Sequence, residues 1–263
     1  MLPLEFLDEI SCFETLRAYG GKIFHLDAHL GRLTESCGGI GRSFPVSKAE
    51  IEKWLKDSLK ESGFPGAILR LSVHPAPDGE GLFVLIIRQF EFHPRELYEK
   101  GVKLRTTVTR RWALKAQDPQ IKASQFVSGV MAFLDKGDRE ARELVFLDQG
   151  GAVAEGTVSN LFIFKQKRLL TPSVSSGILR GVTRSVVLDL ARERRIEVLE
   201  TVLTRHEIYS ADECFMTNTS SEILPVVSVD DRKIGNGLPG PLTKALAGDF
   251  KKAVAKDLDQ RRL

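Results

Sequence analysis

"ELVFLDQGGAVAEGTVSNLFIFKQKRLLTP", residues 143–172, holds two consecutive hairpin patterns and decides the fold of the second half of the chain. In the first hairpin, apolar residues lie on both sides of Gly150 and Gly151, and a Gly-Gly pair accepts the backbone angles of a tight turn. In the second, residues 160–172 form two apolar strands around a short basic turn. Antiparallel strands that follow one another so closely predict a β-rich core.

The rest of the second half alternates between strands and helices, as the spacing of its apolar residues indicates. Further strands are expected at residues 102–110, 196–204, 213–219 and 223–235. Helices are expected at residues 124–138, 179–195 and 240–260.

The first half of the chain begins with a hairpin whose turn is Gly20–Gly21, followed by a short helix at residues 26–41. A second, strongly amphipathic helix is expected to begin after Ser47. Glu50 lies three residues later and completes a capping box, in which the two side chains satisfy each other's backbone amides. Gly63 is expected to end this helix.

Two strong strands follow at residues 66–75 and 81–90, so the first half has the pattern of a β-rich α/β unit with two helices. The boundary between the halves is expected near residues 93–101. We therefore predict an α/β protein of two domains, residues 1–94 and residues 99–263.

The composition of the 263 residues limits the classes of function. Hydrophobic residues make up 42% and charged residues 28%, the balance of a soluble globular protein, and a scattered net charge of +3 is too weak for a nucleic-acid binder. We expect no membrane span, because no segment approaches about 18 apolar residues, and no signal peptide. Cys12, Cys37 and Cys214 are widely spaced and form no CxxC pair. They predict no disulfide framework and no metal site, which suits a reducing cytoplasm.

One lysine stands apart from the basic run that precedes it. "DPQIKASQFV", residues 118–127, contains Lys122 among mostly uncharged residues. In an apolar pocket the pKa of a lysine falls, and its neutral amine can attack a carbonyl carbon. A single lysine far more often reaches solvent. The chemical interpretation therefore needs an aldehyde cofactor, an acid and a phosphate site elsewhere in the chain.

Three segments could supply these parts, and each has an ordinary structural alternative. Glu155 follows an apolar strand and is the candidate acid; a surface turn explains it equally well, but a buried glutamate needs a cation, such as a protonated pyridine nitrogen. "LRGVTR", residues 179–184, opens a helix whose first amides favour a phosphate, although many helices begin after glycine. "MTNTSSE", residues 216–222, is a second anion site or a Ser/Thr-rich turn. Arg32 is a phosphate clamp or a surface arginine.

The order and spacing of these segments resemble the class IV pyridoxal-phosphate aminotransferases, the family of D-amino-acid and branched-chain aminotransferases. The resemblance extends from residues 13–33 to residues 240–246, and its most specific parts are "IK" at Lys122, "FLDQGGAVAEGTVSNLF", "TPSVSSGILRGVTR" and "ADECFMTNTSSEILPV". It implies a two-domain fold-type IV enzyme of the α/β (α+β) class. Residues 1–94 would form a small α/β domain with the substrate pocket and the phosphate arginine. Residues 99–263 would form a larger cofactor-binding domain, built on a β-barrel-like core with helices.

The resemblance also implies a role for each candidate residue. Lys122 is similar to the catalytic lysine that holds pyridoxal 5'-phosphate as an imine and carries a proton between Cα and C4′. Glu155 is similar to the carboxylate that keeps the pyridine nitrogen protonated, and Leu179 to the residue that packs on one face of the ring. The phosphate group is expected to bind at Arg32, Val182, Thr183, Asn218 and Thr219.

Four residues of the first domain are expected to contact the substrate. Phe13 stands where several relatives have a tyrosine that contacts substrate. Arg17 and Arg70 resemble positions that shape the carboxylate pocket in branched-chain relatives, and His74 falls near an arginine of the D-amino-acid branch. Each cation could instead be a strand residue that faces solvent or pairs with a nearby glutamate.

We therefore predict transamination of D-amino acids or branched-chain amino acids with a 2-keto acid as acceptor, by a cytoplasmic homodimer that needs pyridoxal 5'-phosphate. An alternative within the family is 4-amino-4-deoxychorismate lyase, which uses the same lysine and releases pyruvate and 4-aminobenzoate. A third reading is a non-catalytic relative that binds the cofactor. In the first reading the partners are a small amino acid and a keto acid, with no nucleic acid and no membrane.

Overall fold

The computed structural model describes residues 10–42, 44, 46–74, 81–111, 118–124 and 140–260. The helix predicted at residues 124–138 lies outside these ranges except for its first residue. Contacts divide the chain into two compact units. Unit 1 takes its described residues from Met1–Glu91, Gln120–Phe126 and Val254–Leu263, and unit 2 takes its described residues from Phe92–Pro119 and Val127–Ala253.

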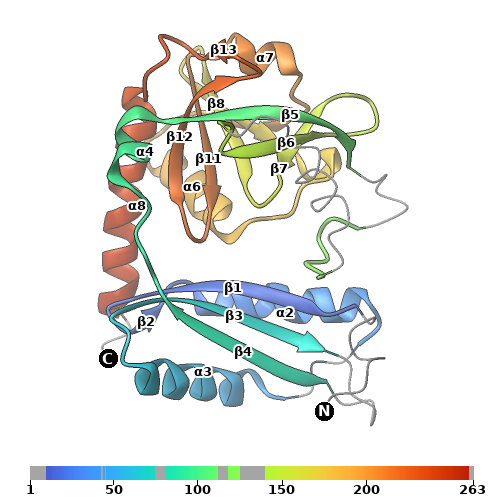
Figure 1. The fold of residues 1–263 in the computed structure, drawn as a ribbon, viewed down its shortest axis with the longest axis vertical. Coiled ribbons are helices and arrows are strands. Elements are labelled where there is room, and N and C mark those ends of the chain that lie inside the picture. The colour runs from blue at the N-terminus through green and yellow to red at the C-terminus, as the bar shows by residue number, and fades with distance from the viewer. Residues whose placement is uncertain are drawn as a thin grey trace. The chain divides into compact units, whose positions relative to one another are not determined.

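Unit 1 contains a four-stranded antiparallel sheet in the order β2-β1-β3-β4 (Figure 1). Its strands are β1 (Cys12–Tyr19), β2 (Lys22–Ile23), β3 (Gly66–His74) and β4 (Leu82–Gln89). The predicted turn between β1 and β2 is confirmed at Gly20 and Gly21, which have φ angles of 53° and 76°. Residues with a Cβ rarely adopt such angles, so glycine suits both positions.

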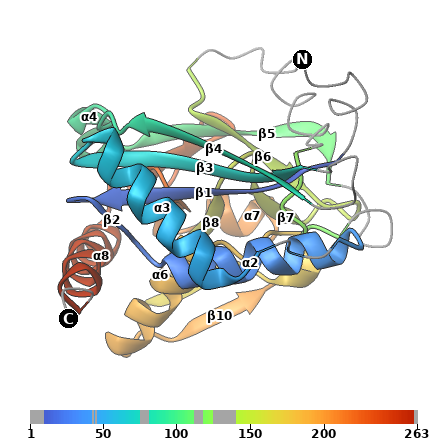
Figure 2. The ribbon, with the colours of Figure 1, turned by 90° about the horizontal axis from the view of Figure 1, so that it is seen from below.

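Two helices, α2 (Leu26–Gly39) and α3 (Lys48–Ser62), cover one face of this sheet (Figure 2). Their apolar stripes pack on alternate residues of β1 and β3. The shared core includes Leu16, Leu30, Leu33, Leu55, Leu69 and Leu71. The predicted capping box is present at the start of α3, where the Ser47 amide donates to the Glu50 carboxylate at 2.9 Å, and Gly63 ends the helix with a φ of 67°.

Unit 2 contains a nine-stranded sheet in the order β10-β9-β8-β11-β12-β5-β6-β7, with β13 paired to β12 (Figure 1). Its strands are β5 (Val102–Arg110), β6 (Glu143–Leu147), β7 (Val153–Gly156), β8 (Asn160–Lys165), β9 (Arg168–Pro172), β10 (Val198–Thr201), β11 (Glu213–Asn218), β12 (Glu222–Val229) and β13 (Arg232–Lys233). Both predicted hairpins, β6–β7 and β8–β9, are confirmed. Val153 in β7 forms a β-bridge with Leu203, which follows β10. The sheet therefore curls into a half-barrel that brings β7 next to the segment after β10.

The helices of unit 2 differ in how they begin. They are α4 (Arg95–Lys100), the 3-10 helix η1 (Val174–Ser176), α6 (Val182–Glu193), α7 (Arg205–Tyr209) and α8 (Pro241–Gln260), whose last residues belong to unit 1. Helix α7 was not predicted from the sequence, although Thr204 and Glu207 form a capping box that could have revealed it. The start of α8 is held by Glu213, whose carboxylate accepts from the Thr243 amide at 2.7 Å.

Two observations on the described residues concern membrane spans and metal sites. None of the helices within these ranges combines the length and apolarity needed to cross a bilayer. In the same part of the chain, no three His, Cys, Asp or Glu side chains gather in a way that could hold a metal ion. Cys12, Cys37 and Cys214 are buried as free thiols.

Candidate active site

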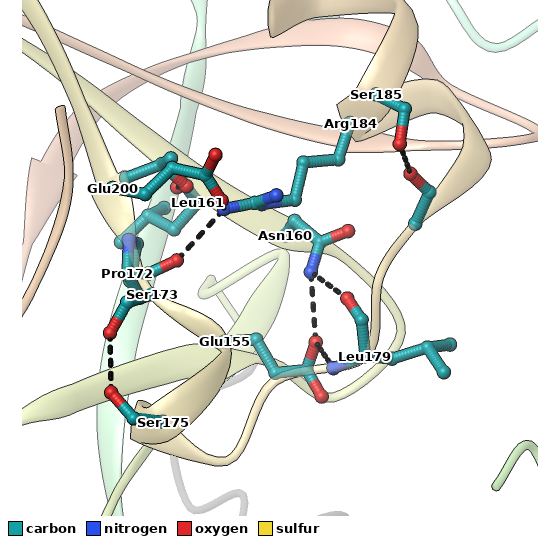
Figure 3. Close-up of polar contacts among 12 residues, drawn as sticks. Glu155, Asn160, Leu161, Pro172, Ser173, Ser175, Leu179, Arg184, Ser185 and Glu200 are labelled. Atoms are coloured by element: carbon teal, nitrogen blue, oxygen red, sulfur yellow. Dashed lines mark hydrogen bonds and ion pairs between the residues drawn. The ribbon is translucent and has the colours of Figure 1, made fainter. Parts of the chain in front are cut away.

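Glu155 lies in β7 with 4% of its surface exposed. Its carboxylate bonds to three residues of unit 2, two of which, Asn160 and Leu179, are drawn in Figure 3. Oε2 accepts from Asn160 Nδ2 at 2.9 Å and from the Leu179 amide at 3.0 Å. Oε1 forms an ion pair with the Arg111 guanidinium, which also lies over the Phe146 ring. The side chain predicted to be the candidate acid is therefore a buried carboxylate.

Arg111 changes one step of the sequence interpretation. We expected a buried Glu155 to need a cation, of which a protonated pyridine nitrogen was one example, and the chain itself supplies a cation at Arg111. A carboxylate in the interior is costly unless it is paired and hydrogen-bonded, and Arg111 meets that requirement. The burial of Glu155 is thus no independent sign of a cofactor. The basic run before Lys122 was the only sequence signal for this partner, and it does not say which arginine turns inward.

Asn160, the first residue of β8, was not predicted and joins Glu155 to the segment before α6 (Figure 3). Its Nδ2 donates to Glu155 and, at 2.9 Å, to the Leu179 carbonyl oxygen. Both neighbours are acceptors, so the amide nitrogen must face them. On the other side of Asn160, a Cβ on Gly181 would lie 2.1 Å from Oδ1, closer than atoms can approach. Glycine is therefore required at position 181 for steric reasons.

The N-terminus of α6 is suited to an anion. Val182 and Thr183 are its first residues, and Gly181 at the N-cap position provides no side-chain cap. The amides of a first helical turn have no partner within the helix, and the helix dipole adds a partial positive charge. Arg184 fixes this end of the helix, because its NH2 group donates to the Pro172 carbonyl oxygen at 3.0 Å and to Glu200 at 2.8 Å.

Asn218 and Thr219 lie where β11 turns into β12. The Asn218 side chain does not point its acceptor at a ligand, because Oδ1 accepts from the Ser220 amide at 3.1 Å and from the Ser221 amide at 2.7 Å. The segment is therefore a turn, as the alternative of a Ser/Thr-rich turn states, and the Asn218 side chain holds it together. The preceding residue, Thr217, pairs with Asn160 across the sheet, so this turn lies beside the Glu155 cluster.

In unit 1, Lys122 lies on a short segment held by β1 and α2. The Phe13 amide donates to the Lys122 carbonyl oxygen at 3.0 Å, and the Lys122 amide donates to Ser36 Oγ at 3.1 Å. The Lys122 Nζ is 4.7 Å from the centroid of the Phe13 ring. Two elements therefore fix the backbone of Lys122, and an aromatic ring adjoins its amine.

Arg32, on α2, forms a buried cluster with Glu14 and His29 in unit 1. The guanidinium donates twice to Glu14, from Nε at 2.6 Å and from NH2 at 2.8 Å, while His29 Nδ1 is 2.7 Å from the same carboxylate. Burial opposes ionisation of Glu14, but Arg32 and His29 outweigh it and lower its pKa to about 2. Burial lowers the pKa of His29. Because the ionised Glu14 carboxylate can only accept, the Nδ1–H of His29 is the donor of this hydrogen bond.

The predicted substrate residues share the face of the unit 1 sheet opposite the helices. Across β1 and β3, Phe13 pairs with Ser72, Thr15 with Arg70 and Arg17 with Ile68, and residues directly opposite point the same way. The Arg70 guanidinium lies 3.7 Å from the Phe13 centroid, on the ring that also adjoins Lys122.

Arg17 and His74 have different surroundings on that face. Arg17 is 4% exposed and its guanidinium lies 3.7 Å from the Phe90 centroid, so it is buried among aromatic rings. His74 Nε2 is 3.0 Å from Ser72 Oγ. Burial and the nearby charge of Arg70 lower the pKa of His74. Arg17 therefore does not face solvent, whereas His74 is partly exposed.

The family model for amino-transferase class IV matches residues 11–229 of this chain. The chain belongs to the class IV aminotransferases. A branched-chain-amino-acid aminotransferase of Pseudomonas aeruginosa is 34% identical, over 89% of this chain and 80% of the relative. A D-alanine aminotransferase of Bacillus licheniformis is also 34% identical, over 93% of this chain and 88% of the relative.

Solved structures extend this family membership to the fold. The T.th. branched-chain amino acid aminotransferase, solved with pyridoxamine 5'-phosphate, has a TM-score of 0.89 and 27% identity, over 94% of this chain and 86% of that chain. The α/β fold predicted for a class IV chain, with a curled sheet in its larger part, is thereby confirmed.

Proposed function

We propose that this class IV chain transfers amino groups between amino acids and 2-keto acids with pyridoxal 5'-phosphate as its cofactor. One observation in unit 2 supports this assignment most strongly. The buried Glu155 carboxylate bonds to the Leu179 amide, and α6 begins three residues later with an uncapped N-terminus. The segment that begins at Leu179 thus links an acceptor for a protonated ring nitrogen, Glu155, to a site for a phosphate at the start of α6.

The residues present suit this cofactor. When bound, pyridoxal 5'-phosphate supplies an aldehyde and a ring that accepts electrons. Glu155 would hold the ring nitrogen, the first amides of α6 and the Thr183 hydroxyl would hold the phosphate, and Leu179 would contact the ring. The Thr217 hydroxyl is buried and has no hydrogen-bond partner within the described residues, so a nearby polar ligand would satisfy it.

In unit 1, we assign Lys122 the covalent attachment of the cofactor and the movement of the substrate proton. Its amine must be neutral for that step, which a site of low polarity favours. Arg32 completes the set of phosphate ligands, with Glu14 holding its guanidinium. Asn218 orders the turn that carries Thr219 and contributes to the phosphate site through that turn.

The substrate class we propose is a D-amino acid or a branched-chain amino acid, as the names of the two curated relatives suggest. Arg70, beside Phe13 and Lys122 on one aromatic ring, is the first candidate for a substrate carboxylate. Arg17 and His74 lie on the same face of the sheet and are further candidates for contact with the substrate. We also propose separate roles for residues 1–94 and 99–263 as substrate and cofactor domains, a homodimeric assembly and a cytoplasmic location.

The lyase reading is not favoured, because the curated relatives of this chain are named as branched-chain and D-alanine aminotransferases. A half-reaction screen separates the three readings. Addition of pyridoxal 5'-phosphate is expected to give a visible absorbance band that disappears with an amino acid while the keto acid accumulates. Pyruvate release from aminodeoxychorismate without a keto acceptor would instead identify the lyase. A band that no amino acid removes would identify a binding protein, and no band would contradict the cofactor.

The role of Lys122 is tested by Lys122→Ala, which is expected to abolish the visible band and the transamination. The matched control is Lys53→Ala, in α3 of the same unit, because the Lys53 side chain is 82% exposed and pairs with nearby Asp57 on the helix surface. The control should keep wild-type activity. Wild-type activity in Lys122→Ala would refute the assignment.

A further inference from the structure

Asn160 is a buried amide at the point where three parts of the proposed cofactor site meet. It is 5% exposed and stands at the start of β8. Its Nδ2 donates to the Glu155 carboxylate and to the Leu179 carbonyl oxygen (Figure 3). The Leu179 amide donates to the same Glu155 carboxylate. These three hydrogen bonds form a closed ring, so the positions of Glu155 and Leu179 cannot change independently.

The same side chain also limits the approach to α6 and the neighbouring strand. Its Oδ1 occupies the space in which a Cβ on Gly181 would lie, at 2.1 Å, so the chain passes directly over it before α6 begins. Across the sheet Asn160 pairs with Thr217, two residues before Thr219. One amide thus adjoins the proposed site of the ring nitrogen, the residue at the ring face and both proposed phosphate segments.

A purely structural role does not account for this placement. A buried amide that only stabilised the sheet would satisfy its donors with neighbouring strand atoms, whereas Asn160 uses both on atoms of the proposed site. Its two acceptors also require Nδ2 rather than a carboxylate oxygen, since a carboxylate has no donor when ionised. The arrangement therefore selects an amide at this position.

We propose that Asn160 is a positioning residue that locks the Glu155 carboxylate, Leu179 and the N-terminus of α6 into one rigid cofactor cradle. This inference rests on the proposed function and adds a part of the site beyond the residues that the family resemblance implies. Asn160 does not need to touch the cofactor. It would act through Glu155 and Leu179.

Two variants test the role by cofactor binding rather than activity. Asn160→Leu has a similar size and removes both donors, and we expect its dissociation constant for pyridoxal 5'-phosphate to rise by about tenfold to a hundredfold, as the loss of bonds to a charged acceptor implies. Asn160→Asp keeps the shape, and it carries the test if Asn160→Leu does not fold. The substituted carboxyl would lie beside Glu155, where burial and like charge raise its pKa.

The aspartate variant has a distinctive pH signature. When protonated, the carboxyl has one O–H donor and can restore the bond to Glu155; when ionised, it repels Glu155. Burial and the charge of Glu155 favour the protonated carboxyl, while the Arg111 guanidinium, which pairs with Glu155, partly offsets them. The ratio of its dissociation constant to that of the wild type should therefore fall as the pH is lowered from about 8 to about 6. A merely structural role predicts a ratio that does not change with pH.

The matched control is Thr171→Val. The Thr171 hydroxyl is fully buried in β9 and donates to the Leu161 carbonyl oxygen at 2.8 Å, next to Asn160 in the chain, without contacting Glu155. The Thr171→Val substitution should lower the melting temperature and leave the cofactor affinity within twofold of the wild type. Wild-type affinity and an unchanged pH ratio in the Asn160 variants, with a wild type that binds the cofactor, overturn this inference alone. A wild type that does not bind it overturns the proposed function and this inference together.

Discussion

The Glu14 cluster gives the sharpest quantitative prediction. Glu14 has an ordinary pKa of 4.5 when exposed, and Arg32 and His29 lower it to about 2 in the folded protein. At 1.36 kcal/mol for each pKa unit, the difference corresponds to about 3 kcal/mol of folding free energy at neutral pH. Glu14→Gln removes the charge and turns one acceptor into a donor that faces Arg32 or His29. We expect it to lower the free energy of unfolding by about 3 kcal/mol at pH 7.

The sign of the pH dependence follows from the lowered pKa. A group whose pKa is depressed on folding stabilises the protein above its unfolded value, 4.5, and loses that effect as the pH falls toward about 2. At pH 3 the contribution should be roughly half of its neutral value, about 1.4 kcal/mol, because the unfolded carboxyl is then protonated. The difference between wild type and Glu14→Gln should therefore narrow on acidification.

Urea unfolding, followed by far-UV circular dichroism at pH 7 and pH 3, measures both quantities. Asp57→Asn is the matched control in the same unit, because Asp57 is 56% exposed and its ion pair with Lys53 is worth at most about 1 kcal/mol. Cofactor affinity should also fall in Glu14→Gln, since Arg32 loses its anchor. A difference below about 1 kcal/mol at pH 7, or one that stays constant down to pH 3, would refute the ion-pair reasoning.

Two further substitutions test the packing around the site and away from it. Gly181→Ala places a Cβ 2.1 Å from Asn160 Oδ1 and causes no backbone strain, since φ at this position is −65°. The overlap is expected to lower the free energy of unfolding by about 1–3 kcal/mol and to weaken cofactor binding. Calorimetry measures the first effect and absorbance titration the second. Unchanged affinity would mean that Asn160 can move aside freely. Glu213→Gln weakens the cap of α8 and should lower stability by about 1 kcal/mol, as measured by thermal unfolding, while the cofactor spectrum stays the same; a changed spectrum would show that α8 affects the site.

Local patterns in the sequence predict the elements well, because their signals lie within a few residues. The capping box of Ser47 and Glu50 and the Gly150–Gly151 hairpin need no information from elsewhere in the chain. The short helix α7 carried the same kind of signal at Thr204 and was overlooked. The resemblance to a known family added the residue roles, which no local pattern contains.

The partners of the candidate residues could not be predicted, because they lie far apart in the sequence. Arg111 and Glu155 are 44 residues apart, and Arg32 and Glu14 are 18 apart. Nothing in the composition around Arg111 distinguishes it from Arg110. Asn160 is a single polar residue at the start of an apolar strand, and only the fold shows that Glu155 and Leu179 both meet it.

The proposed chemistry is tested most directly by detecting the covalent bond between Lys122 and pyridoxal 5'-phosphate. The protein should be incubated with pyridoxal 5'-phosphate, reduced with borohydride, digested and analysed by mass spectrometry. We predict one phosphopyridoxyl group, attached to Lys122, and none in protein first saturated with an amino donor. A label on another lysine, or an unlabelled Lys122, would contradict the account.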